Sequence, residues 1–180
     1  EQPARTAAIA TLGAVALFPL LVLPIIVGGF VDYIGMTESQ AGWATATGAL
    51  GAALAAIPVA LTIHHLDLRR LATAGLIVMA IADALSIAAL SIPVEAFFAL
   101  RFMSGVGAAG VYASVVSGYA AWDAPDRAYG FFMGVQFAIS AAGLYFLPLI
   151  LPTIGIEGLY AGIASMDLVA IGLVTRLPAR

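Results

Sequence analysis

The sequence predicts an all-α polytopic membrane protein with six transmembrane helices. Of its 180 residues, 63% are hydrophobic and only 9% are charged, and the mean hydropathy is +1.08. A soluble domain needs far more charge than this to cover its surface. The apolar residues also form long runs, and most charges fall in the short gaps between them. We therefore expect lipid to be the main solvent of this chain.

Six segments are apolar over the length that a helix needs to cross a membrane. A hydrocarbon core of about 30 Å takes about 20 residues in a helix. Because backbone groups in lipid must be satisfied within each segment, helices are expected, and no segment has the alternating pattern of a membrane barrel. The gaps are too short for a soluble domain, so residues 1–180 are expected to form one domain. The predicted spans lie near 7–31, 40–63, 71–92, 96–121, 128–151 and 158–177.

The positions of the arginines predict the orientation. With six spans, six arginines fall on one side of the membrane, whereas the opposite loops contain none. Translocating arginine in a short loop is costly, so this side is expected to be cytoplasmic. Both termini then lie in the cytoplasm, and the plasma (inner) membrane is the expected location. The six residues are Arg5, Arg69, Arg70, Arg127, Arg176 and Arg180.

The composition also argues against several classes of function. A net charge of -3 provides no basic stripe for nucleic acid. The absence of cysteine excludes disulfides, thiolate metal sites and cysteine nucleophiles. There is no H-E-x-x-H, no G-x-S-x-G and no glycine-rich phosphate loop followed by lysine. Adjacent His64 and His65 would diverge on a helix and suit a shared metal poorly. We expect no enzyme activity, no metal and no cofactor.

Three ionisable residues lie well inside the predicted spans, namely Asp83, Arg101 and Asp167. Such groups are costly in a membrane and are therefore candidates for function. Arg101 and Asp83 can pair if their helices pack side by side, either as part of a proton or substrate relay or as a static buried pair. For Asp83 and Asp167 a structural role is favoured.

Other polar residues are weaker candidates for a solute or proton pathway. Tyr112 shares a helix face with Arg101, and Gln136 lies at mid-depth in the fifth span, so each either lines a cavity or makes an interhelical hydrogen bond. Asp32, at the outer end of the first span, is either a solvated cap or a coupling site. Small residues predict packing seams in the second span at Gly48, Gly51, Ala52 and Ala55, and in the fifth at Gly130 and Gly134.

The fourth span contains Arg101-Phe-Met-Ser-Gly105-Val-Gly107, which resembles the R-x-x-x-G-x-G motif of the major facilitator superfamily. Six helices with both ends inside resemble the amino-terminal half of that family, built as a 3+3 inverted repeat. Between spans two and three the family shows G-x-x-x-D-R-x-G-R-[RK]. Here Arg69 and Arg70 are in register, whereas His65 replaces the Asp and Leu68 the Gly. The fifth span lacks the Gly-Pro signature of drug antiporters.

The resemblance implies a half-size secondary transporter that moves a small solute by alternating access, with proton coupling as one option. Because a complete family member places its pathway between two halves, we expect a homodimer in the lipid bilayer. The alternative is a non-transporting membrane subunit that docks onto another membrane transport protein and stabilises or regulates it. The departures between spans two and three favour this alternative, whereas the intramembrane Arg and Asp residues favour transport.

Overall fold

The computed structural model describes residues 2–88, 91–122 and 124–178. This part of the chain contains helices and turns and no strand, so the predicted all-helical fold is confirmed. Short 3₁₀ turns lie at Ile63–His65, Ser86–Ala88 and Gly172–Arg176. The α-helices are α1 (Gln2–Leu21), α2 (Leu23–Ile34), α3 (Glu38–Thr62), α4 (Leu68–Leu85), α5 (Val94–Ala120) and α6 (Pro125–Ile171).

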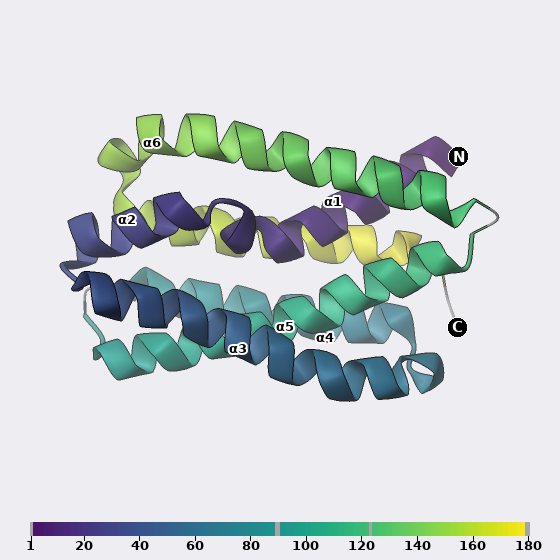
Figure 1. Cartoon of the computed structure of the whole chain (residues 1–180), viewed down its shortest axis with the longest axis horizontal. Coiled ribbons are helices and arrows are strands. Elements are labelled where there is room, and N and C mark those ends of the chain that lie inside the picture. The colour runs from purple at the N-terminus through teal and green to yellow at the C-terminus, as the bar shows by residue number, and fades with distance from the viewer. Residues whose placement is uncertain (1, 89–90, 123, 179–180) are drawn as a thin grey trace.

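The helices of the described chain form six rods, and Figure 1 shows how they run back and forth. α1 and α2 make one rod with a break at Val22, two residues before Pro24, which lacks a backbone N–H and so suits the first turn of a new helix. α6 makes two rods, because the chain folds back at Gly155. The φ of Gly155 is 65° and its ψ is -175°, a conformation that is accessible essentially to glycine alone. The gap expected between 152 and 157 is thus a sharp turn at one residue.

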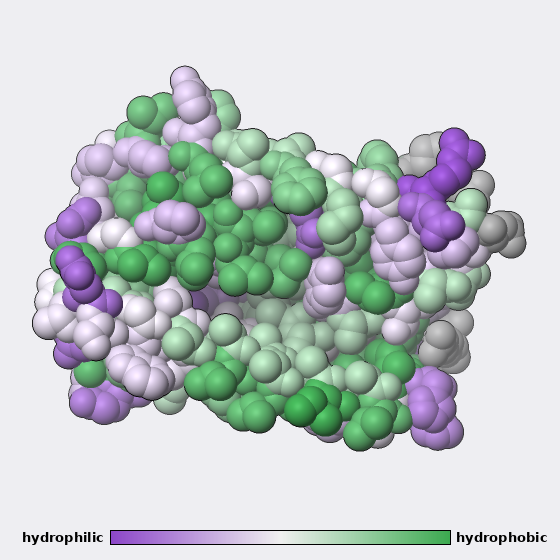
Figure 2. All heavy atoms as spheres, viewed as in Figure 1, coloured by the Kyte–Doolittle hydropathy of each residue, from purple (hydrophilic) through white to green (hydrophobic). Residues whose placement is uncertain are grey.

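Both ends of the described chain lie at the same end of the bundle (Figure 1). Arg5 Nε donates to the carbonyl of Arg176 at 2.8 Å, and Arg69 Nε donates to the carbonyl of Leu177 at 2.9 Å. Arg180 lies outside the described residues. Five segments are long and apolar enough to cross a membrane, and the longest of them, Pro125–Arg176, contains the reversal at Gly155. In Figure 2 the middle of the face is mostly apolar and hydrophilic residues gather toward both ends, as expected of a bilayer-spanning protein.

Close glycine contacts hold α5 between α3 and α4. A Cβ added at Gly105 would overlap the carbonyl of Gly48 on α3, and one added at Gly107 would overlap the carbonyl of Gly75 on α4. The two glycines of the R-x-x-x-G-x-G motif therefore serve opposite faces of one helix. The predicted seam in the second span is present. Gly134, in the other predicted seam, has no atom of the described chain within 4 Å of an added Cβ, and the same is true of Gly130.

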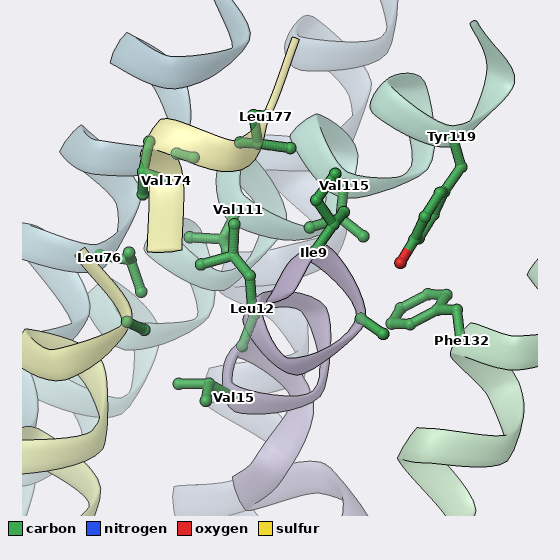
Figure 3. Packing of buried hydrophobic residues seen from close by; sticks show 14 of the residues in the cluster. Ile9, Leu12, Val15, Leu76, Val111, Val115, Tyr119, Phe132, Val174 and Leu177 are labelled. Atoms are coloured by element: carbon green, nitrogen blue, oxygen red, sulfur yellow. The ribbon is translucent and has the colours of Figure 1, made fainter. Parts of the chain in front are cut away.

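Two apolar clusters form the core, one toward each end of the bundle. The first cluster includes Ile9, Val111 and Phe132 (Figure 3), and the second includes Phe30 and Phe97. Three buried charged residues, Asp83, Arg101 and Asp167, each lie along the chain between residues of one cluster and residues of the other.

Candidate functional site

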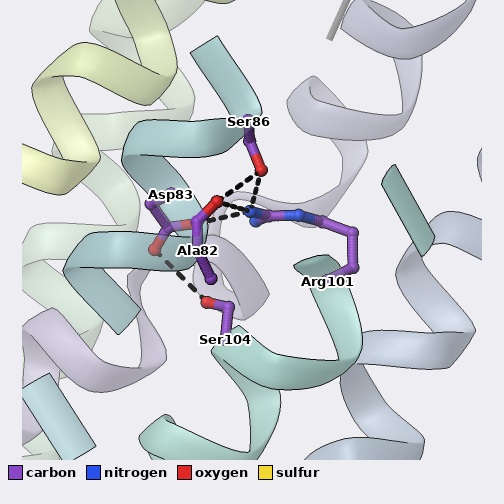
Figure 4. Close-up of polar contacts among 5 residues, drawn as sticks. All are labelled: Ala82, Asp83, Ser86, Arg101 and Ser104. Atoms are coloured by element: carbon purple, nitrogen blue, oxygen red, sulfur yellow. Dashed lines mark hydrogen bonds and ion pairs between the residues drawn. The ribbon is translucent and has the colours of Figure 1, made fainter. Parts of the chain in front are cut away.

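A buried ion pair joins α4 to α5 near the middle of the bundle. Arg101 Nη2 donates to Asp83 Oδ1 at 2.7 Å, and the two side chains are 7% and 0% exposed. Ser104 donates its hydroxyl to Asp83 Oδ2 at 3.2 Å, and Ser86 accepts from Arg101 Nη2 at 2.5 Å. Figure 4 shows the guanidinium reaching from α5 to Asp83 on α4 and to Ser86, directly after α4. The pairing that the sequence allowed is therefore present, and both oxygens of Asp83 are hydrogen-bonded.

Aromatic rings surround the guanidinium. The Cζ atom of Arg101 lies 4.4 Å from the ring centre of Tyr160 and 5.3 Å from that of Phe97. Phe30 packs edge-on against Phe97, with ring centres 5.1 Å apart. A desolvated cation over aromatic faces gains electrostatic stabilisation. Aromatic side chains from α2, α5 and α6 therefore form apolar surroundings for one positive charge.

A second carboxylate, Asp167 on α6, lies next to the pair. It is 0% exposed and interacts electrostatically with Asp83 and Arg101. Neither of its carboxylate oxygens has a hydrogen-bond partner among the described residues, and the same holds for Arg101 Nε and the Tyr160 hydroxyl. The structure buries both Asp83 and Asp167, so that two carboxylates and one guanidinium share one apolar region.

A pocket of about 260 Å³ lies beside this charged cluster. Its walls come from α1, α2, α3 and α5, with Tyr160 of α6, and the face in Figure 2 is hollowed between α1–α2 and α3. Ser104 lines the pocket and also donates to Asp83, so its hydroxyl connects the pocket with the cluster. Most of the lining is apolar, and the polar side chains that line it are Thr45, Arg101, Ser104 and Tyr160.

The remaining candidate residues lie elsewhere. Asp32 is exposed at the end of α2. Tyr112 is half-buried and packs its ring 5.8 Å from that of Phe132, in the first apolar cluster. Gln136 is 5% exposed on α6, and its Nε2 has no hydrogen-bond partner in the described part of the chain. Neither Tyr112 nor Gln136 is among the residues that line the pocket.

Two charged residues where the loop between α3 and α4 meets α4 make hydrogen bonds to other parts of the same chain. Asp67 caps α4 by accepting from the backbone N–H of Arg70 at 2.9 Å. Arg69 holds the carbonyl of Leu177, next to the last 3₁₀ turn. Among the described residues no three metal-ligating side chains come together.

The fold and the site define a multi-pass membrane protein that buries a charged cluster beside a pocket within its helical bundle. A family model described as Major Facilitator Superfamily matches residues 6–179, so the chain belongs to that family of membrane transporters. No curated protein and no solved structure matches the chain. The motif glycines Gly105 and Gly107 are explained by helix packing, whereas Arg101 of the same motif is the cation of the buried cluster.

Proposed function

We propose that this six-helix bundle is a half-size secondary transporter that moves a small solute by alternating access. The observation that carries the proposal is the ion pair of Arg101 and Asp83, buried at the wall of the pocket. In this proposal two copies of the chain form the transporter in the plasma (inner) membrane, with all termini in the cytoplasm.

The cost of the ion pair supports a functional role. Replacing a buried ion pair by apolar residues of similar volume is often neutral or stabilising, so stability alone is a weak reason to keep one. Ionisable groups within a membrane bundle commonly mark substrate or ion pathways. Arg101 meets this description because it lines the pocket while it holds Asp83.

The size and lining of the pocket support a partial solute site. Ligand sites are mostly apolar, contain a few polar groups and typically have volumes of about 300–1,000 Å³. The volume here, about 260 Å³, is just below this range. A second bundle facing the open side would enlarge the site and close it, as in transporters whose pathway lies between two halves.

A large apolar surface on α3 supports assembly with a second bundle. Its side chains are exposed along the whole length of the helix, and a two-fold axis beside it would bring the same surface of a second copy into contact. The exposed residues are Trp43, Leu50, Leu54, Ile57 and Leu61.

The arginines support the proposed orientation. Arg5, Arg69 and Arg176 take part in contacts at the end of the bundle where both termini lie. Arginine in short connections is retained on the cytoplasmic side, so this end is assigned to the cytoplasm.

Alternating access can be tested by cysteine labelling, because residues 1–180 contain no cysteine. Ala49 lines the pocket and is exposed, so we choose Ala49→Cys in proteoliposomes of known orientation. Membrane-impermeant thiol reagents should modify it from either side, since the pocket opens to each side in turn. The control is Val169→Cys, 74% exposed on the outer surface of α6, where lipid should prevent labelling from both sides. Labelling of Ala49→Cys from one side only would contradict alternating access.

The homodimer is tested by crosslinking and by mass measurement of the purified protein in lipid. A specific two-fold dimer supports the proposed carrier. A strict monomer that copurifies with an unrelated membrane transport protein supports the second candidate, a non-transporting subunit. One observation favours this candidate: Arg69, in the loop that departs from the family pattern, is engaged within the chain by the carbonyl of Leu177.

A further inference from the structure

We propose that Asp167 is a proton-binding site, and that its proton is the coupling ion of the carrier. The coupling role rests on the proposed transport function, whereas proton binding itself rests only on the surroundings of Asp167. The argument uses the charges in the cluster, the unused hydrogen-bonding groups and the connection to the pocket.

The hydrogen bonds of the cluster favour Asp83 as the ionised carboxylate. Its two oxygens accept from Arg101 and Ser104. Asp167 has no donor on either oxygen among the described residues, although it is 0% exposed. An ionised carboxylate without donors is very costly in apolar surroundings. One proton on Asp167 removes this cost and leaves one guanidinium opposite one carboxylate.

The elements packed against this part of α6 add no charged side chain to the cluster beyond Asp83 and Arg101, among the described residues. Asp83 comes from α4 and Arg101 from α5, and Tyr160 belongs to α6 itself. The charged residues that the structure describes on α1 and α2 are Arg5 and Asp32, which lie near the two ends of the first rod. The cluster therefore has two acids and one base, and a single proton makes it neutral.

Ser104 provides a route for the proton. It lines the pocket and donates to Asp83, which in turn lies next to Asp167. A hydronium ion in the pocket can give its proton to the oxygen of Ser104 as the serine O–H proton passes to Asp83. One O–H bond breaks in hydronium and one in Ser104, and one forms at Ser104 and one at Asp83, which leaves water and a neutral Asp83. Transfer from Asp83 to Asp167 then restores the pair with Arg101. Release follows the same steps in reverse.

Loss of the proton would change which helices the guanidinium holds together. Arg101 Nε has no hydrogen-bond partner in the described part of the chain, and an ionised Asp167 competes with Asp83 for this cation. Arg101 bound to Asp83 joins α5 to α4, whereas Arg101 bound to Asp167 would join α5 to α6. Since Arg101 also lines the pocket, the protonation state of Asp167 would alter the pocket wall.

Infrared difference spectroscopy of the full chain in lipid nanodiscs, between alkaline and neutral pH, tests the proposal. The wild-type protein should show the C=O band of a buried protonated carboxyl at neutral pH, and Asp167→Asn should lose it. In a pH titration without buffer, Asp167→Asn should bind one proton fewer per chain. The matched control is Glu95→Gln, an exposed acid at the start of α5, which should keep the band and the proton count.

Two further variants keep the result decisive. Asp167→Glu retains a carboxyl and should shift the band in frequency rather than remove it, which separates loss of the acid from loss of the fold. Asp83→Glu also retains both acids and should leave the frequency of the band nearly unchanged, because the proton is on Asp167. A band that persists in Asp167→Asn, or that shifts only in Asp83→Glu, would overturn the assignment. This measurement requires no transport, so it can succeed even if labelling of Ala49→Cys fails to show alternating access.

Discussion

The guanidinium of Arg101 on α5 binds the carboxylate of Asp83 on α4 at 2.7 Å, inside the bundle. Asp83 belongs to the first three rods and Arg101 to the last three, so this contact ties the two halves of the bundle together. Both residues are inaccessible to solvent or nearly so.

The first prediction concerns this pair. Arg101→Gln should destabilise the bundle by about 3–5 kcal/mol, because Asp83 is left as an uncompensated buried charge. Asp83→Asn should have a smaller effect, because Asp167 can ionise and neutralise Arg101. The double variant should cost clearly less than the sum of the two single variants, since neither charge remains. Thermal unfolding in detergent, analysed as a double-mutant cycle, measures this coupling. Additive effects would show that the pair contributes no coupling energy.

The same variant also tests the role of Arg101 in transport. If the pair is part of the mechanism, Arg101→Gln protein that is still folded should lose alternating access, seen as one-sided labelling at Ala49→Cys. Asp83→Asn tests the partner in the same assay. Normal two-sided labelling in folded Arg101→Gln would assign the pair to stability alone.

The second prediction concerns the close approach of α5 to α3. Gly105→Ala should lower stability by about 1–3 kcal/mol, because the added methyl group would overlap the carbonyl of Gly48 and force the helices apart. Gly134→Ala is the matched control. The same atom is added to a helical glycine there, but into open space, so stability should be nearly unchanged or slightly higher. Equal losses in both variants, measured by thermal unfolding, would argue against the packing explanation.

The sequence was sufficient to predict the class of fold. Hydrophobic runs depend only on local composition, and the reversal at Gly155 lies between two of them. The pair of Arg101 and Asp83 could also be predicted from the sequence, because each is an isolated charge inside a span and the two spans are consecutive. Burial of these charges leaves few alternative partners.

The rest of the site depends on tertiary packing, which the sequence pattern does not specify. Asp167 lies 66 positions beyond Arg101 on another helix, and its place beside the pair follows from how α6 folds back. Gly48 and Gly134 look alike in sequence, yet one meets a backbone carbonyl and the other meets no described atom. Tyr112 and Arg101 share a helix face, but the pocket ends before Tyr112.

The third prediction concerns Arg69 and the last turn of the described chain. Arg69→Ala removes the hydrogen bond to the carbonyl of Leu177, a loss of about 1 kcal/mol of local stability. Backbone amides of residues 172–177 should then exchange hydrogen several-fold faster, whereas those in the middle of α5 should be unaffected. The control is Arg70→Ala, which removes the same charge from an exposed neighbour. If both variants accelerate exchange equally, the effect is one of charge and the specific bond is unimportant.

The last prediction concerns the two ends of the bundle. Ser39 is exposed at the start of α3, and Asp126 is exposed at the start of α6. Three rods, α3, α4 and α5, lie along the chain between these two positions. Because an odd number of crossings separates them, the two positions should lie on different sides of the membrane. In intact cells a membrane-impermeant maleimide should label Ser39→Cys directly, and it should label Asp126→Cys only after the membrane is opened. The reverse pattern would keep the fold but place the arginine-rich end outside, against the retention of arginine in the cytoplasm. Labelling of both positions from one side would contradict the six-rod arrangement itself, since these positions would then share one end of the bundle.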